Sequence, residues 1–337
     1  MLLKCLMIES SSSLIDNEVM QPRKLHLWTL TILLLAGCAN SSFSTSSLSS
    51  SSSSLTVSSS SSESSSSASS PQGNQTVIIR DQVYGSFERN TLDIMYLPQV
   101  APQKLVLILH GGSWVAGDKQ DVEFFSEPLI EAGYIYVSMN YRLMLTPATF
   151  KDMLDDIQTA ILFLYLNAST YQINVDAMAI GGVSAGAHLA LLYAYQKTSF
   201  IPIEFVFALV PPVDLTDPSF LEMPGADFQL IQMNSLTGTN VEDEEEILAN
   251  GFPQAWLEAS PIHYAATAKP TLIAYVGLDE LVPVTNVPRL VAKLDEFERV
   301  YEVILFANSG HNLMGDSDQT LFFNERLFAL LSFYLED

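Results

Sequence analysis

Ala179-Ile-Gly-Gly-Val-Ser-Ala-Gly-Ala-His-Leu-Ala190 decides the fold of this chain. It begins as a short apolar strand, turns sharply at Ser184 and continues at once as a helix of small residues. Gly182 and Gly186 flank Ser184 in the spacing G-x-S-x-G, and a serine at such a tight turn needs neighbours without bulk. The helix that starts there directs its free N–H groups toward whatever reacts with the serine. Ordinary strand–helix turns also contain this spacing, so its meaning depends on the rest of the chain.

Short apolar strands alternate with helices on both sides of this stretch, which predicts an α/β fold with a mostly parallel central sheet covered by helices on both faces. The first two strands alternate in polarity and are expected to form a hairpin at the sheet edge. The expected strands are Val77–Val83, Thr91–Tyr96, Lys104–Leu109, Tyr134–Met139, Met178–Gly181, Phe205–Val210, Thr271–Val276 and Tyr301–Phe306. The expected helices are Phe150–Leu166, Ala185–Tyr195, Val287–Phe297 and Thr320–Tyr334.

One part of the predicted domain lacks this rhythm of strands and helices. It spans about residues 215–259, and we expect it to be an insertion that forms a cap or lid over the carboxyl edge of the sheet. Its run of five acidic residues, Glu242–Glu246, is interpreted as the solvated start of a helix and not as a metal site.

The segment before the domain has the pattern of an export signal. Arg23 and Lys24 precede the short apolar run Leu25–Ala36, which ends in small residues, as in a secretory signal peptide. The run is too short for a comfortable membrane span of about 20 residues. An uncleaved N-terminal anchor remains the alternative. Residues 1–19 are an unusual preface to a signal, so Met20 is a candidate start of translation.

A serine-rich segment separates the signal from the domain. Residues 41–70 contain 22 serines in 30 positions, a composition that cannot bury enough apolar surface to form a core. We therefore divide the chain into a signal at 1–38, a disordered tether at 39–75 and an α/β domain at 76–337.

Charge and cysteine content limit the classes of function. The net charge of −23 argues against nucleic acids and anionic lipid surfaces as partners and favours neutral substrates. Both cysteines, Cys5 and Cys38, precede the domain, so no disulfide is expected within it. The five histidines form no close cluster with cysteine, and we expect neither a metal site nor a cofactor.

Ser184 needs a base and an orienting carboxylate if it is a nucleophile. His311 lies in a glycine-containing turn after a late strand and is the expected base, with His263 as the alternative. Asp279 directly follows the strand Thr271–Val276 and is the expected carboxylate. Asp214, which follows the preceding strand, and Glu280 are the alternatives to Asp279. The order serine, aspartate, histidine is that of α/β-hydrolases.

Two of the other histidines are expected to have structural roles. His110 lies in a His-Gly-Gly turn and is expected to brace that loop, while His188, one helical turn past Ser184, is expected to pack against the sheet.

Backbone N–H groups are expected to stabilise the oxyanion that forms when a nucleophile attacks an ester. Ala185, next to the nucleophile, supplies one of them, and the loop Gly111-Gly112-Ser113 supplies others. The two glycines let the backbone approach the carbonyl oxygen, so valine at 112 should block that approach without unfolding the chain. Apolar side chains could line an acyl pocket or equally belong to the core; they are Trp114, Phe220, Met223, Phe228 and Met233.

Several motifs together resemble the α/β-hydrolase esterases, in particular the hormone-sensitive-lipase-like carboxylesterases and the related acetyl- and feruloyl-esterase-like group. They are His110-Gly-Gly-Ser-Trp-Val-Ala-Gly-Asp-Lys119, Asn140-Tyr-Arg-Leu143, Gly182-Val-Ser-Ala-Gly186, Asp279 and His311. The resemblance covers about Leu92 to the C-terminus and implies an α/β-hydrolase fold with a cap.

The resemblance also implies roles for single residues. Ser184 would be the nucleophile, Asp279 and His311 its partners, and the N–H groups of Gly112, Ser113 and Ala185 the oxyanion hole. Ser113 stands where some relatives have a third glycine, which leaves open which loop amides face the oxyanion. Arg142 would be held in a buried ion pair, with Asp152, Asp155 or Asp156 as its partner.

Leu35-Ala36-Gly37-Cys38 resembles the lipobox of bacterial lipoproteins. It implies that Cys38 carries a lipid and that, with Ala39 after it, the protein is exported to the cell envelope, at the outer membrane of a Gram-negative bacterium.

Together these observations predict a lipid-anchored serine carboxylesterase that acts on small neutral acyl esters through an acyl-enzyme. Its partners would be a small-molecule or polysaccharide-borne ester and, through the lipid alone, a membrane; the oligomeric state stays open. An esterase that removes acetyl or feruloyl groups from polysaccharide, a formamidase or a peptidase of the same fold are alternatives. A non-catalytic surface lipoprotein is the contrasting class, and it would have little reason to keep Ser184, Asp279 and His311 together.

Overall fold

The computed structural model describes residues 75–144, 146 and 148–336. The expected signal at 1–38, the lipidation candidate Cys38 and the serine-rich segment as far as residue 74 lie outside the described residues.

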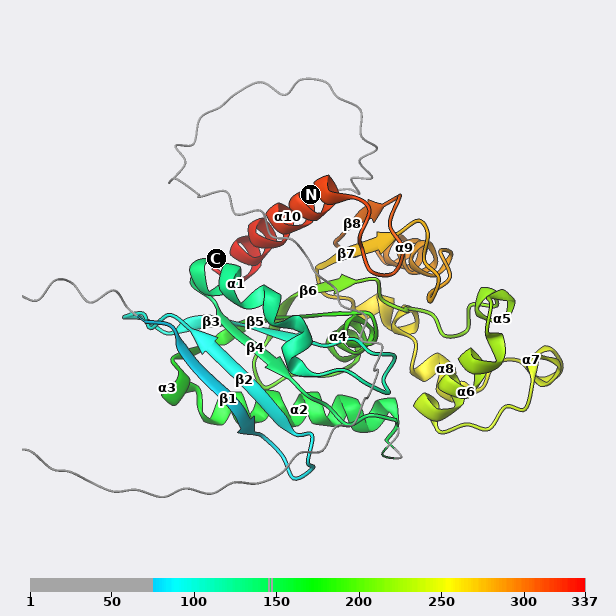
Figure 1. Cartoon of the computed structure of the whole chain (residues 1–337), viewed down its shortest axis with the longest axis horizontal. Coiled ribbons are helices and arrows are strands. Elements are labelled where there is room, and N and C mark those ends of the chain that lie inside the picture. Colours follow the sequence, from blue (N-terminus) through cyan, green and yellow to red (C-terminus); the bar gives the residue numbers. More distant parts are fainter. Residues whose placement is uncertain (1–74, 145, 147, 337) are drawn as a thin grey trace, which may run out of the picture. The chain divides into compact units, whose positions relative to one another are not determined.

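Eight strands form one sheet in the order β1-β2-β4-β3-β5-β6-β7-β8 (Figure 1). β1 pairs antiparallel with β2 and β2 antiparallel with β4, whereas every other neighbouring pair is parallel. The predicted mostly parallel sheet with an edge hairpin is therefore confirmed. The strands are β1 (Val77–Val83), β2 (Thr91–Tyr96), β3 (Gln103–Leu109), β4 (Ile135–Met139), β5 (Ile173–Val183), β6 (Ile203–Leu209), β7 (Thr271–Val276) and β8 (Tyr301–Phe306).

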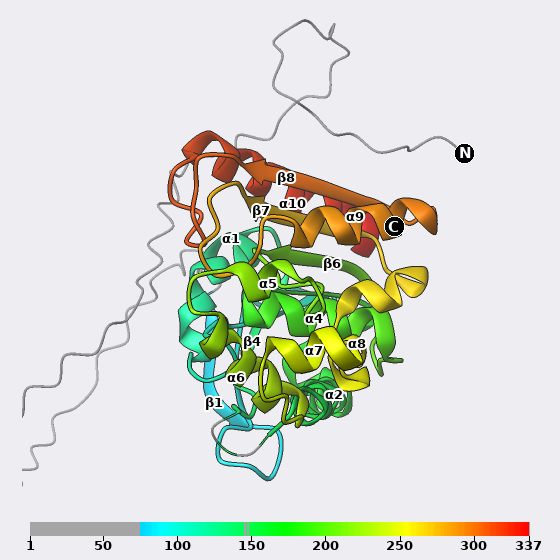
Figure 2. The same ribbon diagram turned by 90° about the vertical axis from the view of Figure 1, so that its right-hand side faces the viewer.

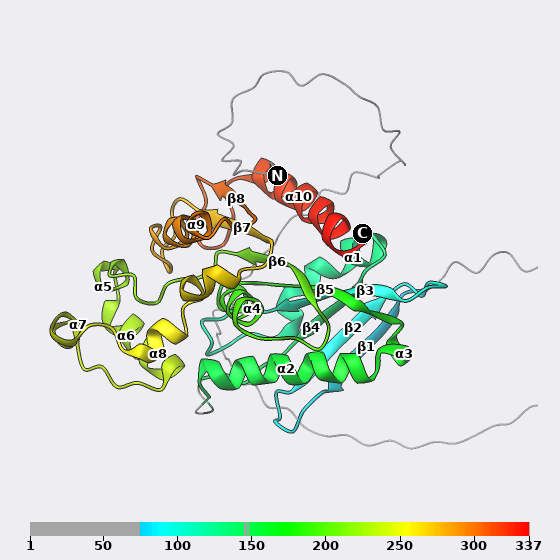
Figure 3. The same cartoon turned by 180° about the vertical axis from the view of Figure 1, so that it is seen from behind.

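Helices cover both faces of the sheet, as the alternating pattern predicted. One face packs against α2 (Phe150–Leu166), α3 (Ala168–Tyr171), α4 (Ala185–Gln196) and α9 (Asn286–Glu296). The other packs against the 3-10 helix η1 (Lys119–Phe125), α1 (Ser126–Glu131) and α10 (Ser317–Leu335). Figure 3 shows α2 and α4 on the opposite side of the strands from α1 and α10.

The segment that lacks strands folds into four short helices. They are α5 (Ser219–Glu222), α6 (Ala226–Thr237), α7 (Glu244–Asn250) and α8 (Gln254–Glu258), and the 3-10 helix η2 (Pro261–Thr267) leads back to the sheet. Figures 1 and 2 show α5–α8 gathered beyond one end of the sheet. The acidic run does start a helix, because the Asp243 side chain accepts the N–H of Glu246 and caps α7.

β5 is longer than predicted, running from Ile173 to Val183 where Met178–Gly181 was expected. It lies between β3 and β6 and pairs with both, so its glycines are held by two ladders at once. The residues not predicted are 173–177 and 182–183, and at Gly182 tertiary pairing overrides a low strand propensity.

An ion pair fastens the segment after β4 to α2. The Arg142 Nε donates to both carboxylate oxygens of Asp156 at 3.0 Å, and its Nη1 donates to Asp152 at 3.0 Å. The predicted pairing of Arg142 therefore involves Asp156 and Asp152, whereas Asp155 makes no hydrogen bond to it within the described residues. The guanidinium also lies over the ring of Phe87.

Among the described residues, none of the helices combines the length and the apolar character that a membrane crossing requires.

Candidate active site

Ser184 occupies the turn between β5 and α4 in a backbone conformation that few residues adopt. Its φ is +53° and its ψ is −118°. Side chains in this region are strained, and such strain persists where the surrounding structure enforces it. The turn places the Ser184 side chain at the N-terminus of α4, where unpaired N–H groups and the positive end of the helix dipole lie.

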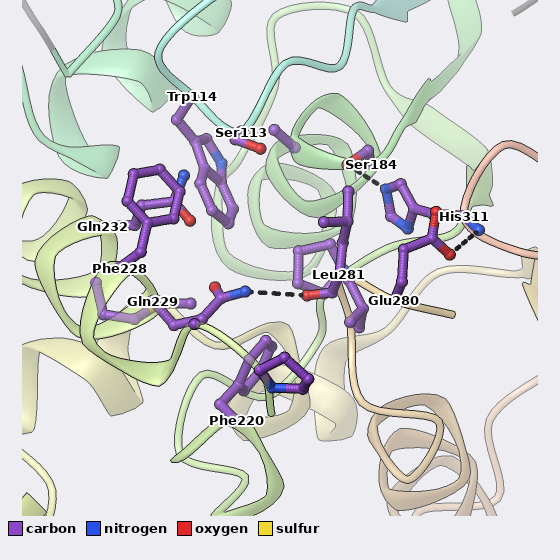
Figure 4. A pocket seen from close by; sticks show the side chains of 16 residues that line it. Ser113, Trp114, Ser184, Phe220, Phe228, Gln229, Gln232, Glu280, Leu281 and His311 are labelled. Carbon is purple, nitrogen blue, oxygen red and sulfur yellow. Dashed lines mark hydrogen bonds between the residues drawn. The ribbon is translucent and has the colours of Figure 1, made fainter. Parts of the chain in front are cut away.

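The carboxyl ends of β7 and β8 bring a histidine and an aspartate to this serine. His311 Nε2 lies 2.8 Å from Ser184 Oγ (Figure 4). On the other side of the ring, Nδ1 lies 3.0 Å from both carboxylate oxygens of Asp279. The Asp279 carboxylate is itself held by the backbone N–H groups of Leu281 and Val282, each at 2.9 Å. The structure therefore brings together the three predicted residues as a hydrogen-bonded chain.

The alternative candidates lie in other contacts. Asp214 is buried and pairs with Arg289, whose Nε donates to it at 2.7 Å. His263 lies in η2, and its ring makes no hydrogen bond to Ser184 within the described residues. Glu280 accepts the backbone N–H of His311 at 3.0 Å, so it contacts the main chain of the base and leaves the ring to Asp279. Neither alternative carboxylate hydrogen-bonds the His311 ring.

Gly186 allows α4 to lie against the end of β3. A Cβ at this position would be 2.3 Å from the Leu109 carbonyl oxygen and 2.4 Å from that of His110. These are backbone atoms, so the contact admits no side chain at 186. The second glycine of the motif therefore sets how closely the nucleophile approaches the loop that follows β3.

The loop after β3 turns through three consecutive residues with positive φ. Gly112 has φ +113°, Ser113 +51° and Trp114 +59°. Ser113 thus has a left-handed φ, which glycine adopts without strain. This explains why glycine would also fit at position 113. The backbone N–H groups of Gly112 and Ser113 donate to no acceptor within the described part of the chain.

The pocket beside Ser184 is lined by two of the four residues predicted to supply oxyanion donors. Ser113 and Ala185 line it, whereas Gly111 and Gly112 do not. The expectation that valine at 112 would only block an approaching carbonyl is wrong. A Cβ on Gly112 would lie 2.3 Å from the Ala116 carbonyl oxygen, so glycine is required there by the turn of the loop itself.

The His110 side chain stabilises this loop. Its ring is fully buried, stacks on Tyr141 at 4.4 Å and donates from Nδ1 to the Gly111 carbonyl oxygen at 2.7 Å. Burial lowers the pKa of His110 to about 4, so the ring is neutral. Nε2 is then free to accept a hydrogen bond from Arg89 Nη2 at 3.2 Å. The predicted bracing role agrees with these contacts.

His188 does more than pack against the sheet. It is fully buried, and Trp114 Nε1 donates to its Nδ1 at 3.2 Å while its Nε2 donates to the Ala259 carbonyl oxygen at 2.7 Å. Burial lowers the pKa of His188 to about 4. The neutral ring thereby links α4 to Trp114 in the loop after β3 and to the residue that follows α8.

A cavity of about 150 Å³ opens beside Ser184 and His311. Trp114 and Phe220, two of the predicted pocket residues, line it and are also buried in the core. Met223 does not line it: this expectation is corrected, because the Met223 side chain packs partly buried against the hydrophobic core. Phe228 and Met233 from α6 complete the apolar part of the wall.

Sequence reasoning missed two polar residues near the site. Gln232 on α6 lines the pocket, and Arg89 in the β1–β2 hairpin reaches the loop after β3. Neither lies in a motif, and no local pattern marks them because their neighbours come from distant parts of the chain. The described residues contain no group of three or more metal-ligating side chains close enough to hold an ion.

Comparison with known proteins adds a family and a fold. The BD-FAE family profile matches residues 92–294. A probable carboxylic ester hydrolase, LipM of Mycobacterium tuberculosis, is 30% identical over 254 residues, which cover 70% of this chain and 57% of that protein. Esterase LipQ of the same organism is 34% identical over 119 residues, which cover 34% of this chain and 28% of LipQ. This chain thus spans little more than half of the first relative and a smaller share of the second.

Solved structures share the arrangement of the sheet and helices. A truncated carbohydrate esterase from gut microbiota matches with a TM-score of 0.59 at 22% identity, covering 75% of this chain and 97% of its own. A bacterial heroin esterase matches with a TM-score of 0.62 at 19% identity, covering 75% of this chain and 83% of its own. At these identities the likeness shows the fold, which is that of the α/β-hydrolases.

Proposed function

The chain belongs to the BD-FAE family, and on this basis we propose that it hydrolyses carboxylic esters through an acyl-enzyme formed on Ser184. The observation that carries the proposal is the continuous chain of hydrogen bonds from Ser184 through His311 to Asp279. A serine hydroxyl is a weak nucleophile until an adjacent base takes its proton. The 2.8 Å contact places the base within reach.

In this proposal each group has one role. Ser184 Oγ attacks the ester carbonyl while His311 Nε2 accepts its proton, and the ring then returns the proton to the departing alcohol. Asp279 holds the Nδ1–H and so keeps Nε2 facing the serine. A water molecule, activated by the same ring, next attacks the acyl-enzyme and releases the acid.

The oxyanion is stabilised by main-chain donors. The N–H groups of Ser113 and Ala185 belong to residues that line the pocket beside Ser184, and the first N–H groups of α4 have no acceptor in the helix. Losing one such donor typically costs about 3–4 kcal/mol of barrier stabilisation.

The size of the pocket favours short acyl or alcohol groups. Sites for drug-sized ligands typically enclose about 300–1,000 Å³, and the cavity here encloses about 150 Å³. Esters of carbohydrates are the second substrate class, favoured by the fold shared with a protein described as a carbohydrate esterase.

The nucleophile is tested by substitution. Ser184→Ala is expected to lower turnover of p-nitrophenyl acetate by on the order of 10³-fold or more and to abolish labelling by a fluorophosphonate probe. Asn308→Ala, on the same loop as His311 but bonded to Asp316, is the control for effects of preparation. Equal activity of Ser184→Ala and the parent chain would remove Ser184 from the mechanism.

We also propose that the protein is exported and anchored to the cell envelope by a lipid on Cys38. The support is the basic, apolar and small-residue order that ends in Leu35-Ala36-Gly37-Cys38, followed by the serine-rich segment. Mass spectrometry of the mature protein is expected to find a lipid-modified N-terminal peptide starting at Cys38. An intact peptide that runs through Gly37 and Cys38 would contradict the anchor.

A further inference from the structure

Gln232 on α6 carries a buried amide that finds no partner in the protein. The residue is 6% exposed, and its Nε2 is buried without a hydrogen bond. Its Oε1 likewise makes no hydrogen bond to any described residue. Most buried polar side chains are bonded, so an orphaned amide calls for an explanation.

Other polar side chains on α6 do make hydrogen bonds. Asn234 bonds the backbone of Val241 through both its Nδ2 and its Oδ1. The Thr237 hydroxyl donates to the Met233 carbonyl oxygen at 2.6 Å. Gln229, which also faces the pocket, donates to the Leu281 carbonyl oxygen at 3.4 Å. Each of the other two amides on α6 therefore makes at least one hydrogen bond, whereas Gln232 makes none within the described residues.

The position of Gln232 points to a ligand. Of the buried, unpartnered side-chain atoms among the described residues, the Gln232 Nε2 is the one whose residue lines the pocket of Ser184 and His311. Figure 4 shows Gln232 and Phe228 on the α6 wall, across the pocket from His311 and Glu280. Trp114, which lines the pocket from the loop after β3, already gives its Nε1–H to His188, so it offers only ring surface. Of the two α6 amides that line the pocket, Gln232 is the one that makes no hydrogen bond within the described part of the chain.

We propose that the Gln232 amide binds a hydroxyl group of the ester substrate and thereby selects hydroxyl-bearing esters; this rests on the proposed ester hydrolysis at Ser184. A hydroxyl both accepts and donates, so it can pair with either end of the amide. A hydroxyl-free ester leaves the amide unpaired when it displaces water from the pocket. Sites built around such a contact reject analogues that lack it more strongly than apolar pockets reject an added group.

Matched ester pairs test the proposal and show which part of the substrate carries the hydroxyl. One pair is trans-2-hydroxycyclohexyl acetate and cyclohexyl acetate, which differ in the alcohol. The other is methyl 3-hydroxybutyrate and methyl butyrate, which differ in the acyl group. We expect the parent chain to prefer the hydroxylated member of one pair. Gln232→Met should lower kcat/KM for that member by about 10–100-fold, the loss of one hydrogen bond to a buried partner, and change the hydroxyl-free member by less than about threefold.

Two controls separate this role from a structural one. Gln229→Met adds apolar surface to the same wall and is expected to change both members of each pair by the same factor. Thermal unfolding is the second readout: Gln232→Met removes an unpaired buried amide and should leave Tm unchanged or raise it. Gln232→Leu repeats the substitution with a second shape, in case methionine packs poorly.

The outcomes are distinct. If Gln232→Met and Gln232→Leu change both members of each pair alike, or lower Tm by several degrees, the Gln232 amide is structural and the proposal is overturned. If the parent chain hydrolyses none of the esters and the fluorophosphonate probe fails to label Ser184, the proposed function fails and this selectivity fails with it. Labelling of Ser184 without any hydroxyl preference overturns the Gln232 proposal alone.

Discussion

At the scale of single residues, the site depends on the backbone conformation of Ser184 and on the lack of a side chain at Gly186. Ser184 takes a left-handed φ, and the missing side chain at 186 lets α4 touch the carbonyl oxygens at the end of β3. Close packing transmits any added atom to its neighbours, because interiors contain few voids. The distance between the nucleophile and the loop of Ser113 is thus set by a glycine.

Gly186→Ala tests this contact. The added Cβ should push α4 from β3, lowering the free energy of unfolding by about 1–3 kcal/mol and lowering kcat on a short acyl ester by on the order of 100-fold, as expected of a misplacement near 1 Å. Urea unfolding and steady-state kinetics measure the two effects. Gly133→Ala is the control for kcat: an added Cβ there meets no atom within 4 Å, and the positive φ of Gly133 lowers stability without displacing α4. Wild-type kcat in Gly186→Ala would show that the helix relaxes freely.

At the scale of elements, the loop after β3 is held by the hairpin that forms the β1 edge of the sheet. Arg89, between β1 and β2, donates to the carbonyl oxygens of Gly117 at 2.8 Å and Tyr141 at 2.9 Å. It also reaches His110 Nε2 at 3.2 Å and the Asn140 side chain at 3.3 Å. One guanidinium therefore joins the hairpin, the loop that carries Ser113 and the segment after β4.

Arg89→Met removes these bonds and leaves the carbonyl oxygens unpaired. Since the loop carries the oxyanion donor Ser113, we expect kcat to fall by about 10–100-fold, a part of what a lost donor costs. Trp114 on the same loop lines the pocket but is held separately by His188, so KM should change by less than about threefold. Arg80→Met is the matched control on the same hairpin. Arg80 pairs with Asp93 and Glu123 and makes no hydrogen bond to this loop. Equal loss of kcat in the two variants would refute a positioning role for Arg89.

At the scale of the whole molecule, two buried neutral histidines join segments that are distant in the sequence. His110 contacts the loop after β3 and Arg89, and His188 contacts Trp114 and Ala259. His110 and His188 are both fully buried, and burial lowers the pKa of each from 6.5 to about 4. In the unfolded chain these rings take up protons below pH about 6.5. Between that pH and about 4 the unfolded state therefore binds more protons than the folded state.

The free energy of unfolding should consequently fall as the pH drops from 7 toward 4. At pH 5 each ring accounts for about 2 kcal/mol of this loss, from 1.36 kcal/mol for each unit of pKa difference. Carboxylates whose pKa is lowered, such as Asp118 and Asp152, add to the loss in the same direction at still lower pH. Urea titrations at pH 8 and pH 5 measure the slope. In His188→Gln about half of the loss assigned to the two rings should disappear; an unchanged slope would mean that His188 is charged in the folded state.

The sequence by itself determined the eight strands, the four helices α2, α4, α9 and α10, the parallel sheet covered on both faces and the positions along the chain of Ser184, Asp279 and His311. These follow from local patterns: each of the three residues lies in the turn or loop that follows a strand, and the carboxyl ends of parallel strands meet at one edge. Only the tertiary structure decided that Ser113 and Ala185 face the pocket while Met223 does not. It also decided the partners of Arg89, His188 and Gln232, because a side chain's hydrogen bonds, or the lack of them, depend on residues that lie far along the chain and become neighbours only when the layers pack.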